Sequence, residues 1–197
     1  MGGRLLHRNQ GWWSELAHGE GPANWSEGTS LAIINDNWWV WGTGTIGDRF
    51  YQTRDGGATW ETISNPATNA PYGGGSYGIV YASPNGWYYA TSAVNGILRT
   101  RDGASWEQIP NSPNCVVIIG DGKNLFCSFM WHRDAIFEVA ESALSNTLSS
   151  PAWRQIYNPS PMPDDPDSGA VSLAYDSVHK VLYAACGQGG LWRMRVE

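Results

Sequence analysis

Charged residues and long apolar runs are both scarce in this chain of 197 residues. Charged residues make up 15% of the sequence, below the roughly 25% that is usual in globular domains. The formal net charge is −6 with only 12 Lys and Arg residues, so no basic stripe exists to meet phosphates and we expect no nucleic-acid partner. No apolar run reaches the roughly 18 residues of a membrane-spanning helix, and we expect no membrane partner.

The first ten residues, MGGRLLHRNQ, lack the apolar core of a signal peptide. The chain can still be a mature or truncated form, so secretion stays open, and an extracellular or periplasmic location is the favoured one.

Cysteine is also rare, and Cys115, Cys127 and Cys186 do not have the spacing of a metal motif. Cys115 and Cys127 flank GDG, a hairpin-turn signal, so they are expected on adjacent strands. A disulfide between them stays open, with buried free thiols as the favoured interpretation. The carboxylates of PDDPDSG (163–169) lack the spacing of a calcium loop. We therefore expect no metal and no cofactor.

The chain is rich in tryptophan (12), tyrosine (9) and glycine (24), which indicates short strands and tight turns. A Trp-x-x-Ile/Leu pattern recurs at spacings of 47, 46 and 47 residues. Its copies are WSEL at Trp13, WETI at Trp60, WEQI at Trp106 and WRQI at Trp153. A second short apolar segment precedes each copy, so each period contains at least two adjacent strands.

Each period also contains an earlier hairpin, in which two apolar runs are joined through Asn, Asp, Gly or Pro. The hairpins are SLAII-NDN-WWVW (30–41), GIVY-ASPNG-WYYA (78–90), CVVII-GDGKN-LFCS (115–128) and VSLAY-DSVHK-VLYAA (171–185). Four strands per period of 40–50 residues predict an all-β fold, a β-propeller of four-stranded antiparallel blades. We expect three complete blades and half-blades at both termini. The complete blades span about 28–63, 72–109 and 112–156, and a split blade combines 168–197 with 1–17.

One segment resembles a known motif closely. Thr53-Arg54-Asp55-Gly56-Gly57-Ala58-Thr59-Trp60 matches the Asp-box pattern Ser/Thr-x-Asp-x-Gly-x-Thr-Trp. The chain therefore resembles the Asp-box (BNR repeat) propellers of the sialidase-like superfamily. TRDGASW (100–106) is a copy that is shorter by one residue, and RNQGWW (8–13) is a degenerate copy. The motif is specific for architecture and not for activity, because unrelated functions share it.

The resemblance places the Asp box at the turn between the third and fourth strands, on the rim opposite the ligand face. The aspartate can accept hydrogen bonds from backbone N–H groups of the turn, and glycine supplies unusual dihedral angles. The tryptophan can then pack under the turn between sheets. We assign structural roles to these residues: Asp55, Gly57, Trp60, Asp102 and Trp106.

The two ends predict an unusual closure. The N-terminal segment has the third and fourth strands of a blade, and the C-terminal segment has the first, second and third. Unpaired half-blades leave exposed sheet edges, so some pairing is required. The ends can meet in one chain as a small four-bladed ring. They can also meet across two chains as a homodimer, or join further blades of a larger parent, and these last two are favoured.

In the resembled superfamily the ligand face is built by loops between second and third strands and between blades. MWHRD (130–134) carries the densest chemistry there, because an indole can stack on a sugar ring beside donors and acceptors. Arg49 and Asp48 form a similar pair in the first blade, and two tyrosines lie in a Gly-rich loop. The candidate ligand-binding residues are Trp131, His132, Arg133, Arg49, Tyr72 and Tyr77.

Whether the chain is an enzyme stays open. The Arg-Ile-Pro motif of the resembled sialidases is missing, and only Arg49 and Arg133 are placed for an arginine triad. Glycosidases generally use two carboxylates across a cleft, and Asp48 and Asp134 are the only candidates.

The leading functional hypothesis is a propeller module that binds a glycan at its loop face, with carbohydrate as the expected partner. One alternative is a glycoside hydrolase or polysaccharide lyase of propeller type, active as an assembly. The other is a scaffold that docks proteins.

Overall fold

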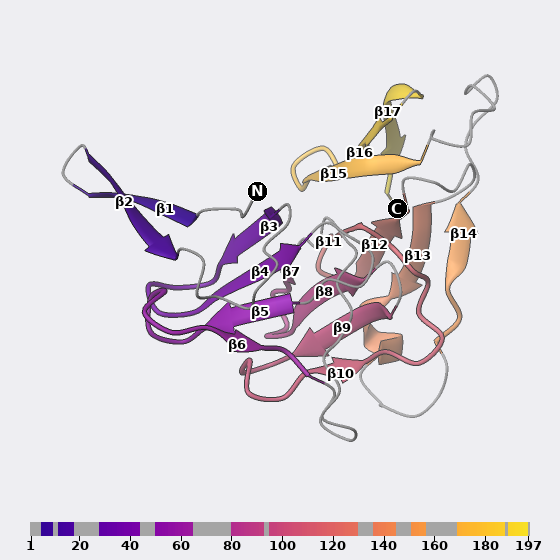
Figure 1. Ribbon diagram of the computed structural model, residues 1–197. Helices are drawn as coiled ribbons and strands as arrows, with labels where there is room; N and C mark the ends of the chain where they lie inside the picture. The colour runs from indigo at the N-terminus through magenta and orange to yellow at the C-terminus, as the bar shows by residue number, and fades with distance from the viewer. Residues whose placement is uncertain are drawn as a thin grey trace.

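Antiparallel β-sheets make up nearly all of the structure, a computed structural model (Figure 1). The only helical element in the described part is the 3-10 helix η1 (Glu141–Leu144), and no described helix is long and apolar enough to cross a membrane. The residues that the structure describes are 5–9, 12–17, 28–43, 50–64, 80–92, 95–129, 136–144, 151–156, 169–187 and 189–196.

Three sheets have four strands each, in simple meander order. The first contains β3 (Gly28–Ile33), β4 (Trp39–Thr43), β5 (Phe50–Thr53) and β6 (Glu61–Thr62). The second contains β7 (Val80–Ala82), β8 (Tyr88–Ser92), β9 (Gly96–Thr100) and β10 (Glu107–Gln108). The third contains β11 (Val117–Gly120), β12 (Asn124–Ser128), β13 (Ile136–Ala140) and β14 (Arg154–Ile156). The prediction of four-stranded antiparallel sheets is confirmed.

The two ends of the chain form smaller sheets. A fourth sheet has three strands, β15 (Ala170–Asp176), β16 (Val181–Cys186) and β17 (Gly190–Arg195). A hairpin of β1 (Leu5–Asn9) and β2 (Trp12–Ala17) stands at the other end. Among the described strands, β2 pairs only with β1, and β17 pairs only with β16.

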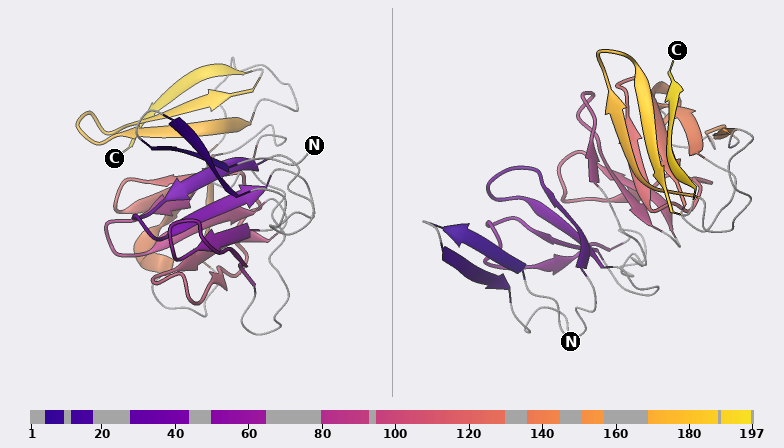
Figure 2. Two further views of the ribbon diagram at one scale, coloured as in Figure 1. Left: turned by 60° about the vertical axis from the view of Figure 1, so that its left-hand side comes forward. Right: turned by 90° about the horizontal axis from the view of Figure 1, so that it is seen from above.

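The sheets follow one another along an arc, with the β1–β2 hairpin at one end and the β15–β17 sheet at the other (Figure 2). Three apolar clusters fill the spaces between successive sheets, from the first sheet to the fourth. Each inner sheet therefore contributes side chains to two clusters. In β8, for example, Ala90 faces the first sheet while the neighbouring Tyr89 faces the third.

Burial on both faces explains the unbroken apolar runs of the sequence. All residues of β9 are buried, since its sheet packs against the first sheet on one face and the third on the other. The outer strand β17 instead has no buried residue, and its Leu191 is 74% exposed. A strand is thus buried on both faces where sheets cover both of them, as in the inner strands of α/β folds.

Polar residues on the third strands connect neighbouring sheets. The side-chain amide Nε2 of Gln52 donates to Glu61 Oε1 of its own sheet (2.7 Å) and to the Gly103 carbonyl of the next sheet (2.6 Å). Its Oε1 accepts from Trp38 Nε1 (3.2 Å) and from Trp106 Nε1 (3.4 Å). Gln52 is 4% exposed, so these bonds satisfy a polar group that would otherwise be costly to bury.

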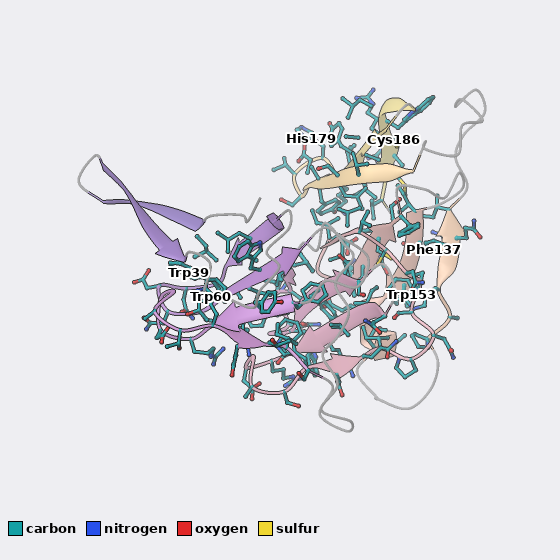
Figure 3. The ribbon with its side chains drawn as sticks, viewed as in Figure 1. Trp39, Trp60, Phe137, Trp153, His179 and Cys186 are labelled. Atoms are coloured by element: carbon teal, nitrogen blue, oxygen red, sulfur yellow. The ribbon has the colours of Figure 1, made fainter. Side chains whose placement is uncertain are left out.

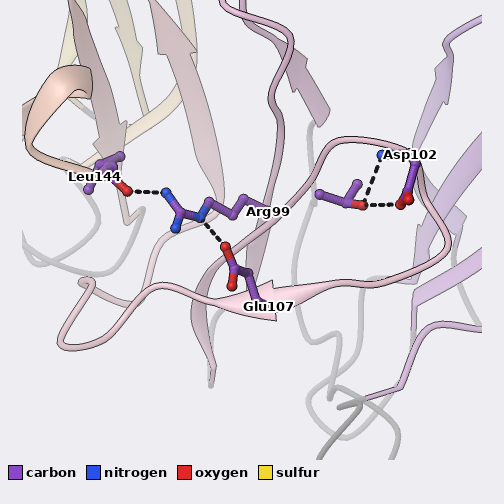
Figure 4. Close-up of polar contacts among 5 residues, drawn as sticks. Arg99, Asp102, Glu107 and Leu144 are labelled. Carbon is purple, nitrogen blue, oxygen red and sulfur yellow. Dashed lines mark hydrogen bonds and ion pairs between the residues drawn. The ribbon is translucent and has the colours of Figure 1, made fainter. Parts of the chain in front are cut away.

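Arg99 has the same place in β9, one repeat further on. Its Nε donates to Glu107 Oε1 on the fourth strand (2.6 Å), and its Nη1 donates to the Leu144 carbonyl at the end of η1 (Figure 4). In the third sheet, Glu138 of β13 pairs with Arg154 of β14. Each of the three sheets therefore joins its third and fourth strands through a polar pair.

All three cysteines are free and buried, in agreement with the favoured interpretation of Cys115 and Cys127. Both lie in the cluster between the second and third sheets. Burial, together with a hydrogen bond that the thiol donates to Cys115, raises the pKa of the Cys127 thiol.

Trp106→Ala is expected to lower the free energy of unfolding by about 3–5 kcal/mol, because a large side chain that is 2% exposed leaves a cavity between two sheets. Urea denaturation measures this loss. Trp106→Phe keeps most of the volume and should cost less than half as much. A loss below about 1 kcal/mol for the alanine variant would contradict the described packing.

Gly103→Ala is expected to lower the free energy of unfolding more than Gly86→Ala does. Both glycines have positive φ, 74° and 85°, so either alanine costs about 1–2 kcal/mol in backbone energy. A Cβ at position 103 would also lie 2.5 Å from Trp38 Cζ2, whereas nothing lies within 4 Å of one at position 86. The extra crowding adds about 1–3 kcal/mol. Equal losses in thermal or urea unfolding would contradict this contact.

Candidate functional site

The arc has two rims, which contain different connections between strands. The turn rim, as we name it, contains the hairpin turns and the connections between third and fourth strands, at 34–38, 54–60, 83–87 and 101–106. A backbone bond from Gly56 N to Asn37 O (3.0 Å) ties two of these turns together. The loop face is the opposite rim, where second strands connect to third strands and each sheet connects to the next.

The 53–60 turn is held by a compact set of hydrogen bonds around Asp55. Its Oδ1 accepts from Thr53 Oγ1 (2.7 Å) and from the backbone N–H of Thr59 (2.8 Å). Its Oδ2 accepts from Thr59 Oγ1 (2.6 Å). Thr53 Oγ1 in turn accepts from Gly57 N (2.9 Å). Both carboxylate oxygens of Asp55 are therefore engaged within the turn.

These bonds set the charge state of Asp55. The hydroxyl bond from Thr59 and then its backbone bond lower the pKa of Asp55 from 3.8 to about 2, since donors stabilise the ionised form. Asp55 thus stays charged at all physiological pH values and acts as an acceptor.

The tryptophan after the turn packs on its own sheet. The Trp60 ring meets Trp41 edge-on, with ring centroids 5.9 Å apart. It meets Trp39 in the same way at 6.5 Å, and both of these side chains are labelled in Figure 3. Gly57, at φ 96°, lies beneath the same group, and a Cβ there would come within 3.0 Å of Trp39. The sequence predicted a position between sheets, and Trp106 has it. These two ring contacts of Trp60 are with the second strand of its own sheet.

The 100–106 turn repeats the arrangement with one residue fewer. Thr100 Oγ1 accepts from Gly103 N (2.9 Å), and Asp102 Oδ1 accepts from the backbone N–H groups of Ala104 (2.8 Å) and Ser105 (3.3 Å). The backbone bonds from Ala104 and Ser105 lower the pKa of Asp102. The threonine-to-glycine bond and the aspartate acceptor are common to both turns.

The described part of the loop face is held by small polar side chains at strand ends. Ser92 Oγ accepts from Asn95 N (2.9 Å), Ser112 Oγ accepts from Ile97 N (2.8 Å) and Asn114 Oδ1 accepts from Gly96 N (3.1 Å). Ser128 Oγ accepts from Ala170 N (3.1 Å) and so connects the third and fourth sheets. These bonds fix the points at which the loops leave the sheets.

The backbone is closely packed at Gly96, where a loop joins the second sheet. Its φ is 69°, and a Cβ there would lie 2.8 Å from the Ser112 carbonyl oxygen. Only glycine fits this conformation and this approach.

All candidate ligand-binding and catalytic residues lie outside the described part of the chain, so their roles stay predictions. They are Trp131, His132, Arg133, Arg49, Tyr72, Tyr77, Asp48 and Asp134. Among the described residues, no group of three or more His, Cys, Asp or Glu residues gathers to hold a metal ion.

The sequence interpretation missed the polar residues between the sheets. Gln52 and Arg99 are 47 positions apart, so the tryptophan spacing could have identified them. It also missed Glu141, which is 4% exposed at the start of η1. Burial and then the charge of Glu141 raise the pKa of Tyr81 to about 12 and raise that of Tyr89 as well.

Comparison with protein families and with curated proteins finds no match. Among solved structures, YCF48 bound to D1 peptide is 18% identical with a TM-score of 0.55, covering 98% of this chain and 57% of that one. YCF48 from Cyanidioschyzon merolae is 17% identical with a TM-score of 0.57, covering 96% and 60%. An ancestral GH74 enzyme is 12% identical with a TM-score of 0.51, covering 86% and 24%.

These neighbours are β-propellers, and the predicted β-propeller fold of this chain is confirmed. The chain is a propeller module that spans 57–60% of the length of the YCF48 chains it matches.

Asp55→Asn should make the free energy of unfolding depend less on pH in the acid range. The lowered folded pKa contributes stability that is present above pH 3.8 and is lost as pH falls toward about 2. The variant should unfold at lower urea concentration at pH 7, and its stability should fall less steeply than that of the wild type between pH 4 and pH 2.

Thr59→Val removes the hydroxyl donor to Asp55 but keeps the backbone donor. The pH dependence of its stability should therefore lie between those of the wild type and Asp55→Asn. Urea midpoints measured across this pH range test the prediction. Identical slopes for Asp55→Asn and wild type would contradict it.

Proposed function

We propose that the chain is an Asp-box β-propeller module that docks an extended polypeptide segment on its loop face. Support for the Asp-box class comes from the turns at 53–60 and 100–106, in which a threonine and an aspartate collect the same backbone donors. This assigns Asp55 and Asp102 a structural task on the turn rim and leaves the loop face for ligands.

The single observation that carries the polypeptide ligand is the resemblance to YCF48 bound to D1 peptide, which extends over 98% of the chain. The loops of this chain offer matching chemistry, because Trp131 can cover apolar side chains while Arg133 can bind carboxylates or carbonyls. Arg49, Tyr72 and Tyr77 would extend the same surface over the first and second blades. The net charge of −6 further favours partners that carry basic or neutral segments.

A glycan is the second candidate ligand. Trp131 favours it, because an indole face suits a sugar ring, and the fold is shared with a GH74 enzyme. In that case His132 and Arg133 would bind hydroxyl groups beside the stacked ring. A hydrolase or lyase reaction would additionally need the two carboxylates Asp48 and Asp134.

Trp131→Ala is expected to weaken binding at least tenfold on an array of extended peptides, without lowering the unfolding midpoint. Val178→Ala is the matched control, because Val178 is 82% exposed on the turn rim and its loss should leave binding unchanged. The same two variants are measured on a glycan array.

Binding to peptides alone supports the docking function, whereas binding to glycans alone replaces it with the second candidate. Glycan turnover that Asp134→Asn abolishes would establish the enzymatic alternative. If the wild type binds neither peptides nor glycans, the proposal is overturned.

A further inference from the structure

Glu141 brings a carboxylate into the space between the second and third sheets. It is 4% exposed at the start of η1, and neither Oε1 nor Oε2 has a hydrogen-bond partner among the described residues. Its backbone N–H donates to the Lys123 carbonyl (2.7 Å), which fixes it against the turn between β11 and β12. An ionised carboxylate is costly to bury unless hydrogen bonds and an opposite charge compensate it.

A row of side chains across the second sheet faces this carboxylate. Tyr81 of β7 opposes Tyr89 of β8, and Tyr89 opposes Arg99 of β9. Arg99 in turn opposes Glu107 of β10. The rings of Tyr81 and Tyr89 stack, with centroids 6.4 Å apart and an interplanar angle of 17°. Burial, and then the charge of Glu141, raises the pKa of both phenols, so Glu141 lies beside the tyrosine end of the row.

The phenol oxygen of Tyr89 shares the situation of the carboxylate. Tyr89 Oη is buried and has no hydrogen-bond partner in the described part of the chain. Glu141 approaches it closely enough to raise its pKa, but the two groups do not form a hydrogen bond of ordinary geometry. Two carboxylate oxygens and one phenol oxygen therefore lie together between the sheets. Gly120 lets the second phenol approach the third sheet, because a Cβ there would lie 2.7 Å from Tyr81 Oη.

The buried cation of the row does not balance the charge of Glu141. Arg99 Nε donates to Glu107 Oε1 (2.6 Å) and its Nη1 donates to the Leu144 carbonyl, as Figure 4 shows. Arg99 is thus paired with another carboxylate. The charge of Asp121 acts in the same direction as that of Glu141, since it also raises the pKa of Tyr81. The tyrosine end of the row therefore has an excess of negative charge.

We propose that an alkali cation, Na⁺ or K⁺, binds between the second and third sheets, with the Glu141 carboxylate and Tyr89 Oη as ligands. One positive charge neutralises one carboxylate, and oxygen atoms are the ligands that hard cations prefer. Ca²⁺ typically takes several carboxylate ligands, whereas Glu141 is the one carboxylate among these ligands. A water molecule would supply hydrogen bonds but no compensating charge.

The cation would connect η1 of the third sheet to β8 of the second. Its ligands lie far apart in the sequence and include a tyrosine, and no acidic cluster marks them within the described residues. The sequence motifs therefore did not indicate this site. Glu141 follows the third strand β13 and is bonded to the β11–β12 turn, so the site is separate from the loop face. It does not depend on the ligand proposed for that face.

Thermal unfolding of the full chain in choline chloride, NaCl or KCl at one ionic strength tests the site. Choline is too large for a buried position, so it supplies equal screening without binding there. We expect the wild type to melt at least about 3 °C higher in about 300 mM NaCl or KCl than in choline chloride, because a ligand of the folded state raises stability.

Three variants locate the effect. Glu141→Gln keeps the shape of the side chain but removes its charge, and it should lose the difference between the salts. Tyr89→Phe keeps the ring but removes the oxygen, and it should reduce the difference at least twofold. Glu138→Gln is the matched control, because Glu138 lies in the same sheet and pairs with Arg154, and it should keep the full difference.

A shift in only one alkali salt supports the site and identifies its ion. Equal melting temperatures of the wild type in all three salts would overturn the proposal. An undiminished difference in Glu141→Gln, or an equal loss of the difference in Glu138→Gln, would do the same, because the salt effect would then arise elsewhere. If Glu141→Gln fails to fold, Tyr89→Phe decides by the same criterion.

Discussion

Packing of each sheet against its neighbours is the interaction on which the whole structure depends. No sheet here closes a core by itself, and the apolar side chains of β8 and β9 are divided between two neighbouring clusters. The free energy of folding therefore depends on nearest-neighbour contacts, as in other repeat proteins. The same dependence makes the first and last sheets of the arc different from the rest, because each has one face without a complete neighbouring sheet.

Two kinds of polar contact give this apolar stack its geometry. Within a sheet, the Asp55 and Asp102 turns fix how the third strand passes to the fourth, through bonds that span no more than four residues. Between sheets, Gln52 and Arg99 reach a backbone carbonyl of the following sheet. The first kind forms locally. The second forms only when neighbouring sheets are already packed, so it specifies their alignment.

The strands and their order could be predicted from the sequence because both are encoded locally, by the tryptophan spacing and by turn residues such as Gly56 and Gly57. The same analysis placed the tryptophan of each turn between sheets, and Trp106 lies there. The ring contacts of Trp60 with Trp39 and Trp41 lie within its own sheet, and such contacts leave no pattern in the composition. Contacts such as that of Arg99 with Leu144 depend on three-dimensional placement and left no local pattern to detect. The proposed ligand face lies in loops outside the described residues, so its residues stay predictions.

The third-strand polar residues also limit how such a chain can evolve. Gln52, Arg99 and Glu138 occupy equivalent sites but differ in charge, and each is matched to its own fourth-strand partner. These pairs lie within one repeat, but Gln52 and Arg99 also donate to a backbone carbonyl of the following repeat, so duplicating or deleting an internal repeat would change the partner of a buried amide or ion. Gain or loss of repeats is therefore least costly at the termini, where water can still solvate a mismatched group.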